Sequence, residues 1–192
     1  GRPDYEEMLR KLCCCCGACE EGETATFDNA ISLDSRRTFG ALVASKYHAA
    51  RAGQVLAEQS VLQDRAYWEI TLEGEAKSPS LAVGVVSPAH TLGERLGNGR
   101  TSWVLQSSEL PRPLKAGDVI GVALNQSDFP VTLRFFLNGK LCNELMGPST
   151  ESTPVVALHT DDTAVAVNFG ATSFSQSAPS GYGGLIKSRS II

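Results

Sequence analysis

The chain has 192 residues, which fits one domain plus a short appendage. Its 17 Lys and Arg residues against 21 Asp and Glu residues give a net charge of −4. No block of basic residues suited to phosphates is present, so the composition disfavours nucleic-acid binding. No apolar run approaches the roughly 20 residues that span a bilayer.

The first 22 residues differ in kind from the rest. Tyr5, Met8, Leu9 and Leu12 follow helical spacing, which predicts a short amphipathic helix outside a main domain at residues 23–192. The charged start lacks the apolar core of a signal peptide, and the main domain holds a single cysteine, Cys142. Because one cysteine cannot form an internal disulfide, we expect an intracellular, cytoplasmic protein.

Five cysteines crowd the end of this predicted helix: Cys13, Cys14, Cys15, Cys16 and Cys19. Three interpretations are open. Thiols beside an amphipathic helix are candidates for S-acylation, which would associate the chain with a membrane. The Cys13-x-x-Cys16-x-x-Cys19 spacing resembles that of metal ligands, although a closed zinc site needs four, so no metal or other cofactor is expected. Thiols also behave as small apolar groups that pack against a domain or a partner.

From Thr24 onward, short alternating segments are separated by turn residues. The predicted strands are Thr26–Leu33, Leu42–Ser45, Gln54–Glu58, Tyr67–Leu72, Leu81–Val86, Ser102–Leu105, Val119–Leu124, Val131–Leu137, Leu141–Leu145, Pro154–Leu158 and Ala164–Phe169. Many short strands without long helices between them predict an all-β fold, an antiparallel sandwich of two sheets. A turn of helix within His48–Gln59, a solvated turn at Asp34 with Arg36-Arg37, and an irregular tail at 175–184 complete the prediction.

The clearest local signal is a β-hairpin over Val131–Leu145. Asn138-Gly139 tolerates the positive φ angles of a tight turn. A two-residue loop would set Leu141 opposite Phe136, and a three-residue loop would set it opposite Leu137. The second register is favoured, because it collects the apolar residues of both strands on one face.

Several segments resemble the motifs of the SPRY domain, the core of B30.2-type modules, in that family's order. They are Tyr67-Trp68-Glu69, Ala82-Val83-Gly84-Val85, Leu96-Gly97-Asn98 with Trp103, Gly117-Asp118-Val119-Ile120-Gly121-Val122, Phe135-Phe136-Leu137-Asn138-Gly139-Lys140, Pro154-Val155-Val156 and Val167-Asn168-Phe169-Gly170. The resemblance covers roughly residues 60–170. It implies a bent two-sheet sandwich that binds protein partners through loops at one edge and performs no catalysis.

The resemblance also indicates which loops would bind a partner. The long Ser87–Arg100 loop and the segment after the Pro154-Val155-Val156 strand correspond to loops that clamp a peptide in SPRY proteins with a SOCS box. The aromatic contact of those proteins is absent from the second segment, so their peptide specificity does not carry over. The candidate partner-binding residues are His90, Arg95, Asn98, Arg100, His159, Thr160, Asp161 and Asp162.

The same residues admit other interpretations. Asp161 and Asp162 are adjacent, and neighbouring strand residues point to opposite faces, so a turn-capping role is favoured over acid–base catalysis. The histidines His48, His90 and His159 fit no recognised catalytic or metal motif, so no enzyme is expected. Trp68 is expected in the core, whereas Trp103 could lie in the core or on the surface.

Two functional hypotheses follow. The first is a non-catalytic interaction module, an adaptor that binds a protein segment through edge loops, with the Cys-rich helix docking it to a membrane or complex. The second is a structural subunit built permanently into a large assembly, for example a ciliary or cytoskeletal one.

Overall fold

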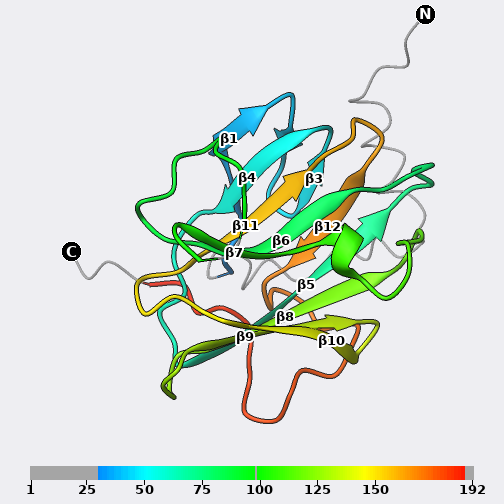
Figure 1. Ribbon diagram of the computed structural model, residues 1–192. Helices are drawn as coiled ribbons and strands as arrows, with labels where there is room; N and C mark the ends of the chain where they lie inside the picture. The colour runs from blue at the N-terminus through cyan, green and yellow to red at the C-terminus, as the bar shows by residue number, and fades with distance from the viewer. Residues whose placement is uncertain (1–29, 98, 189–192) are drawn as a thin grey trace, which may run out of the picture.

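The computed structural model describes residues 30–97 and 99–188, and these form two antiparallel β-sheets stacked face to face (Figure 1). The first sheet has the strand order β1-β4-β11-β6-β7, and the second has the order β10-β9-β8-β5-β12-β3-β2. The strands are β1 (Leu33–Gly40), β2 (Val43–Ala44), β3 (His48–Ala50), β4 (Gly53–Ala57), β5 (Arg65–Glu73), β6 (Leu81–Val86), β7 (Ser102–Gln106), β8 (Val119–Asn125), β9 (Thr132–Leu137), β10 (Lys140–Met146), β11 (Thr153–Leu158) and β12 (Ala164–Asn168).

The all-β, two-sheet prediction is therefore confirmed. The predicted N-terminal helix and its five cysteines lie outside the described residues, as does Asn98. Within the described ranges, no helix is long and apolar enough to cross a membrane. The described residues also contain a short 3₁₀ helix, η2 (Ser107–Glu109), directly after β7.

Two local predictions were wrong. The segment expected to hold a turn of helix, His48–Gln59, forms β3 and β4 instead. Asp34, Arg36 and Arg37 lie within β1 rather than in a turn. β1 is an edge strand whose register with β4 shifts between Leu33 and Thr38, so its polar side chains can face solvent without disturbing the sheet.

The main core fills the space between the sheets. Alternate residues of β5 and β9 point inward, including Trp68 and Phe135, which are 1% and 0% exposed. Trp68 is thus a core residue, as predicted. Trp103 is half-buried and packs against the edge of this core.

A second, smaller core lies on the outer face of the five-stranded sheet. Val86, Val104 and Val155 point outward from β6, β7 and β11, yet all are buried. Leu96 covers them from the loop that joins β6 to β7. This loop therefore packs on the sheet, and its position is fixed by apolar contacts as well as by hydrogen bonds.

The β9–β10 hairpin combines both registers considered above. Asn138 and Gly139 form a two-residue loop with φ angles of 50° and 78°, and Leu141 pairs with Phe136. The favoured three-residue loop was wrong at the turn. A bulge at Cys142 then adds one residue to β10, so that Leu145 pairs with Leu133 as the favoured register required. Leu141 is left 52% exposed, whereas Leu145 and Cys142 pack against the core.

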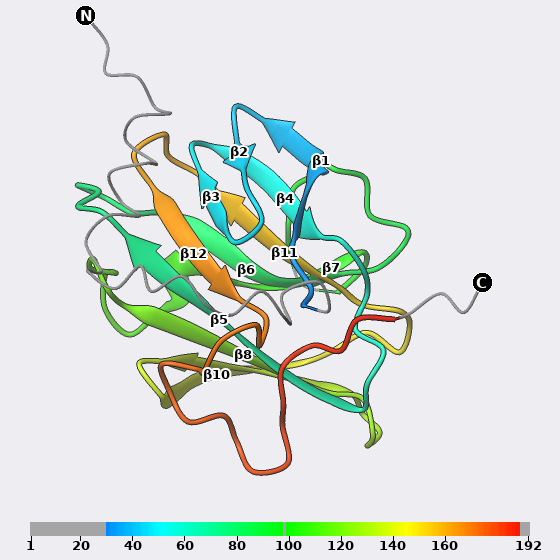
Figure 2. The same ribbon diagram turned by 180° about the vertical axis from the view of Figure 1, so that it is seen from behind.

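The tail after β12 crosses the outer face of the seven-stranded sheet, as the orange and red segments in Figure 2 show. Glu69 anchors it: the backbone N–H groups of Ser175 and Gln176 donate to its carboxylate at 2.7 and 2.8 Å. The Tyr67 hydroxyl donates to the same carboxylate at 3.2 Å, and the Phe174 ring packs edge-on against Tyr67. Burial and the adjacent Glu69 charge raise the pKa of Tyr67, so the phenol stays protonated and keeps donating.

Candidate functional site

The loop between β6 and β7 is braced against β4 by a single side chain, that of Gln54. The Gln54 amide nitrogen donates to the Glu94 carbonyl at 2.7 Å, and its oxygen accepts from the Gly93 N–H at 3.0 Å. In both ribbon views part of the loop therefore runs beside β1 and β4 (Figures 1 and 2).

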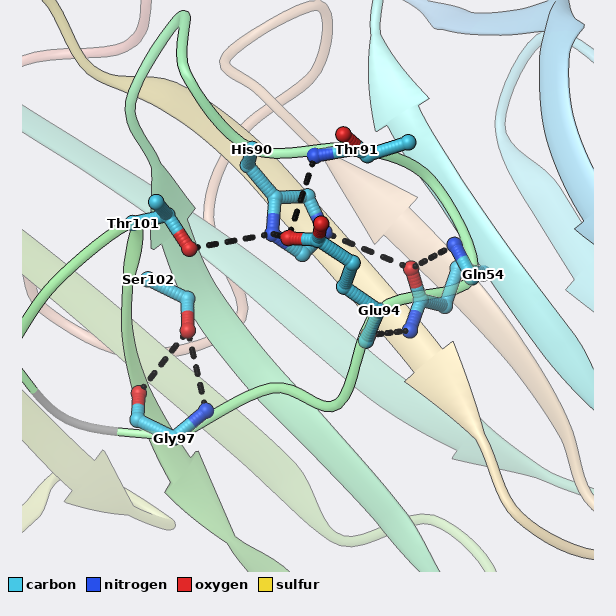
Figure 3. Close-up of polar contacts among 8 residues, drawn as sticks. Gln54, His90, Thr91, Glu94, Gly97, Thr101 and Ser102 are labelled. Carbon is cyan, nitrogen blue, oxygen red and sulfur yellow. Dashed lines mark hydrogen bonds and ion pairs between the residues drawn. The ribbon is translucent and has the colours of Figure 1, made fainter.

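His90 lies inside this loop, where Figure 3 shows it among Gln54, Thr101 and Glu94. Its side chain is 0% exposed, and its ring nitrogens lie 3.5 Å from the Gln54 oxygen and 3.5 Å from the Thr101 hydroxyl. Burial lowers the pKa of His90, against the smaller opposite effect of Glu94. His90 is thus neutral at pH 7 and holds the loop together from within, so it cannot touch a partner in this conformation.

The second half of the loop, which leads into β7, is held by hydrogen bonds to Ser102. Its hydroxyl accepts from the Gly97 N–H at 2.9 Å and donates to the Gly97 carbonyl at 3.1 Å (Figure 3). Ser102 is buried, so these bonds are shielded from water. The Gln106 amide also reaches the Leu96 carbonyl at 3.4 Å. These bonds, together with the buried Leu96, fix residues 93–97 of the loop on the molecular surface.

An open groove of about 510 Å³ lies between this loop and the end of β7. The residues that line it include Gln54, Glu94, Arg95, Leu96, Gln106 and His159. The His159 ring nitrogen lies 3.2 Å from the Gln106 amide oxygen, and burial lowers the pKa of His159. The groove thus offers guanidinium, imidazole, carboxyl, hydroxyl and amide groups, which suits the polar backbone of an extended peptide.

An aromatic ring flanks the groove. Phe39, on β1, is 53% exposed and packs against Gly93. Gly93 has a φ of +93°, which favours glycine, and a Cβ atom there would lie 2.7 Å from the Phe39 ring, so a larger residue would displace the ring. The groove therefore combines polar groups with an exposed apolar side chain at its edge, the composition typical of a peptide-binding surface.

The predicted site residues divide into those at the groove and those elsewhere. Arg95 and His159 come from different loops and meet at the groove, and Arg100 is exposed farther along the same loop. The carboxylate of Asp161 accepts from the Ala52 N–H, and that of Asp162 accepts from the Lys77 N–H, so both support neighbouring turns. Hydrogen bonds from Thr160 and from the Lys77 backbone lower the pKa of Asp162. The Thr160 hydroxyl bonds to that of Thr163.

The residues missed in the sequence include Gln54 and Gln106, which line the groove, and Phe39, which flanks it. They lie on β1, β4 and β7, and only the sheet order brings them to one place. The single sequence signal was an aromatic residue in a polar segment, Phe39, and this could not be placed without the loop that packs on it.

The third histidine, His48, lies on the other sheet, away from His90 and His159. His48 pairs with Glu73 at 3.0 Å on the outer face of the other sheet, and this hydrogen bond raises the pKa of His48. Among residues 30–97 and 99–188, no three His, Cys, Asp or Glu side chains are grouped so that they could hold a metal ion.

Comparison with known proteins identifies the fold. No protein-family model matches the chain, and no curated protein sequence matches it. Solved SPRY domains do match. The SPRY domain of human HERC1 superimposes with a TM-score of 0.55 at 18% identity, over 71% of this chain and 96% of that one.

Two further structures give the same result. A human SPRY domain superimposes with a TM-score of 0.56 at 16% identity, covering 70% of this chain and 98% of its own. The PSpry domain of TRIM65 gives 0.54 at 17% identity, covering 72% and 91%. The chain therefore has the SPRY fold.

Proposed function

We propose that this chain is a non-catalytic protein-interaction module that binds an extended segment of a partner protein in the groove between the β6–β7 loop and β7. The observation that carries the proposal is the bracing of that loop by Gln54 and Ser102. A preformed groove binds a peptide without the cost of ordering the loop. The SPRY fold supports the proposal, since the family resemblance implies partner binding through edge loops and no catalysis.

Three side chains are proposed to contact the partner. Phe39 supplies an apolar anchor, Arg95 a charged donor and His159 a neutral donor or acceptor. His90, Thr160, Asp161 and Asp162 hold the loops in place instead. Arg100, which is exposed, and Asn98 complete the predicted set.

The combined variant Phe39→Ala, Arg95→Ala and His159→Ala is expected to lose at least tenfold in affinity for the main partner, because hot-spot truncations cost about 2 kcal/mol or more. The measurement is quantitative pulldown from the native cell with labelled wild type as reference. The matched control is Phe129→Ala with Lys115→Ala, an exposed aromatic and an exposed cation outside the groove. Equal recovery of every partner by the groove variant would refute the proposed binding surface.

We also propose that the cysteine cluster at Cys13, Cys14, Cys15, Cys16 and Cys19 docks the module, through S-acylation, to a cytoplasmic membrane surface. The intact mass of protein from its native cell should fall by whole acyl chains after hydroxylamine, which cleaves thioesters. An unchanged mass with thiols that resist alkylation would favour the alternative, a subunit built permanently into a large assembly such as a ciliary or cytoskeletal one. An unchanged mass with reactive thiols would reject both.

Within the SPRY proteins, a closer kinship is proposed from three sequence features. All three resemble features of SPRY domain-containing protein 7. They are the cysteine-rich segment, Pro154-Val155-Val156 followed by Asp161-Asp162, and Pro179 with Gly181-Tyr182. No RING, coiled-coil or SOCS-box motif is found in these 192 residues, so their sequence does not support a ubiquitin-ligase role for them.

A further inference from the structure

A small hollow of about 260 Å³ lies on the outer face of the seven-stranded sheet, on the other sheet from the groove. β5 and β12 form its floor, and the loop after β12 forms its wall. The polar residues that line it include Tyr47, Glu69, Thr71, Asn168, Ser173 and Ser175. Its volume is below the roughly 300–1,000 Å³ of small-molecule sites, which suits a single inserted side chain.

The Tyr47 hydroxyl is the feature that points to a ligand. Among the described residues it is the one buried side-chain polar atom that has no hydrogen-bond partner. Burying a hydroxyl without a partner costs about 1–3 kcal/mol, so native proteins seldom leave one in that state. A ligand group that hydrogen-bonds to Tyr47 would recover this cost.

The charge of the residues that line the hollow determines whether it favours a positively or a negatively charged ligand. Glu69 is 1% exposed, and the groups that bind its carboxylate in the structure are neutral: the Tyr67 hydroxyl and the N–H groups of Ser175 and Gln176. These donors satisfy the carboxylate oxygens without supplying a positive charge. No Lys, Arg or His side chain is found among the described lining residues. The Lys46 ammonium, 5.6 Å from the centroid of the Tyr47 ring, is not part of the lining.

The remaining polar groups are mainly hydroxyls that can accept hydrogen bonds. The Asn168 amide is already used, because it donates to the Thr172 and Ser173 carbonyls and accepts from the Gly170 N–H. Thr71, Ser173 and Ser175, which carry hydroxyl groups, line the hollow together with Tyr47. Ala166 and Ala171 supply a small apolar surface. An oxygen-rich lining with one negative charge and an apolar floor matches a long basic side chain, whose methylene stem packs while its charged end donates.

From these observations we infer that the hollow receives a basic side chain of an extended partner segment, with arginine favoured because its guanidinium has five donors for the several oxygen atoms. This is a second docking point, and it goes beyond the loop groove described above. Binding should perturb the 171–175 wall, because residues of that segment line the hollow.

The probe is the peptide acetyl-Gly-Arg-Gly-amide, titrated into the isotope-labelled full chain and followed by amide NMR. The wild type is expected to show saturable shifts at Thr71, Asn168 and Ser173. The citrulline analogue has the same shape without the charge, and we expect it to bind about tenfold more weakly, since a charge-assisted hydrogen bond is roughly twice as strong as a neutral one.

Tyr47→Phe is the decisive variant. It removes a hydroxyl that lacks a partner in the described structure, so the melting temperature should stay the same or rise, while affinity for the arginine peptide falls about five- to tenfold. Thr71→Val, which also removes one hydroxyl, should weaken binding independently. Tyr182→Phe is the matched control and should bind as the wild type does.

Three results would overturn the inference. The first is no binding of the arginine peptide at millimolar concentration, which would mean that water alone fills the hollow. The second is equal binding of the arginine and citrulline peptides, and the third is unchanged binding by both Tyr47→Phe and Thr71→Val. The groove variant of Phe39, Arg95 and His159 should still bind the probe, so the two sites can fail separately.

Discussion

Replacing Phe135 with Asp is expected to abolish the cooperative thermal unfolding of the domain. Phe135 lies at the centre of β9, and its side chain is fully buried between the sheets. Loss of the ring alone costs about 3–5 kcal/mol. The buried carboxyl group adds several kcal/mol more, because no partner replaces the water that it loses. The sum approaches the whole free energy of unfolding of a typical domain, about 5–15 kcal/mol.

The measurement is circular dichroism during a thermal scan, with two controls. Phe129→Asp introduces the same side chain at a position that is 89% exposed, and its melting temperature should equal that of the wild type. Phe135→Leu keeps an apolar core residue, and we expect it to lose only about 1–2 kcal/mol. A Phe135→Asp protein that melts cooperatively near the wild-type temperature would show that the hairpin does not face the core.

The second large effect is expected at Asp118, which joins three segments. Its carboxylate accepts two bonds from the Arg112 guanidinium at 2.7 and 2.8 Å. It also accepts from the Lys115 N–H at 2.7 Å and from the Asn138 amide in the β9–β10 turn at 2.9 Å. The hydrogen bonds from Arg112, followed by those from Asn138 and Lys115, hold the pKa of Asp118 well below its usual range.

Asp118→Asn should destabilise the domain by about 2–3 kcal/mol at pH 7, because it removes charge from a side chain that is 8% exposed and turns an amide toward Arg112. This free-energy change allows for the exposure of Arg112, which is 38%, because water partly screens the charge of its guanidinium. For a chain of this size we expect the melting temperature to fall by about 5–10 °C.

The pH dependence follows from the direction of the pKa shift. Asp118 has a lower pKa in the folded state than the value of about 3.9 for the unfolded chain, so its ionised form stabilises the fold. This contribution is fully present above about pH 5 and is lost as the pH falls below 4. Chemical unfolding between pH 6 and 3 should therefore show a shallower decline for Asp118→Asn than for wild type. Asp64→Asn, at an exposed position, is the matched control. Parallel curves for wild type and Asp118→Asn would contradict the role of Asp118.

Most strands could be predicted from the sequence because their signals are local. Leu81–Val86 matches β6 without error, and the other strands with strong apolar patterns, such as β8, differ at their ends by a residue or two. β1 was missed because its polar residues face solvent at a sheet edge, where alternation is weak. The hairpin register was half right, because the bulge at Cys142 depends on packing against the core and not on the turn residues.

The candidate site could be predicted only in part. Arg95 and His159 were predicted because long loops on a rigid sandwich often bind partners, and both line the proposed groove. The inward position of His90 could not be read from the sequence, since it depends on Gln54 of β4 reaching across the loop. Likewise, Asp161 and Asp162 support turns because of backbone N–H groups at Ala52 and Lys77, which are far away in the chain.

The most direct test of the binding surface is photo-cross-linking in the native cell. A benzophenone amino acid replaces Phe39 or Arg95 at the groove, or Phe129 outside it, one position at a time. We predict that Phe39 and Arg95 capture the same partner, through an extended segment that mass spectrometry can map, and that His159→Ala weakens both products. Capture of that partner from position 129, with none from positions 39 and 95, would contradict the groove as the binding site.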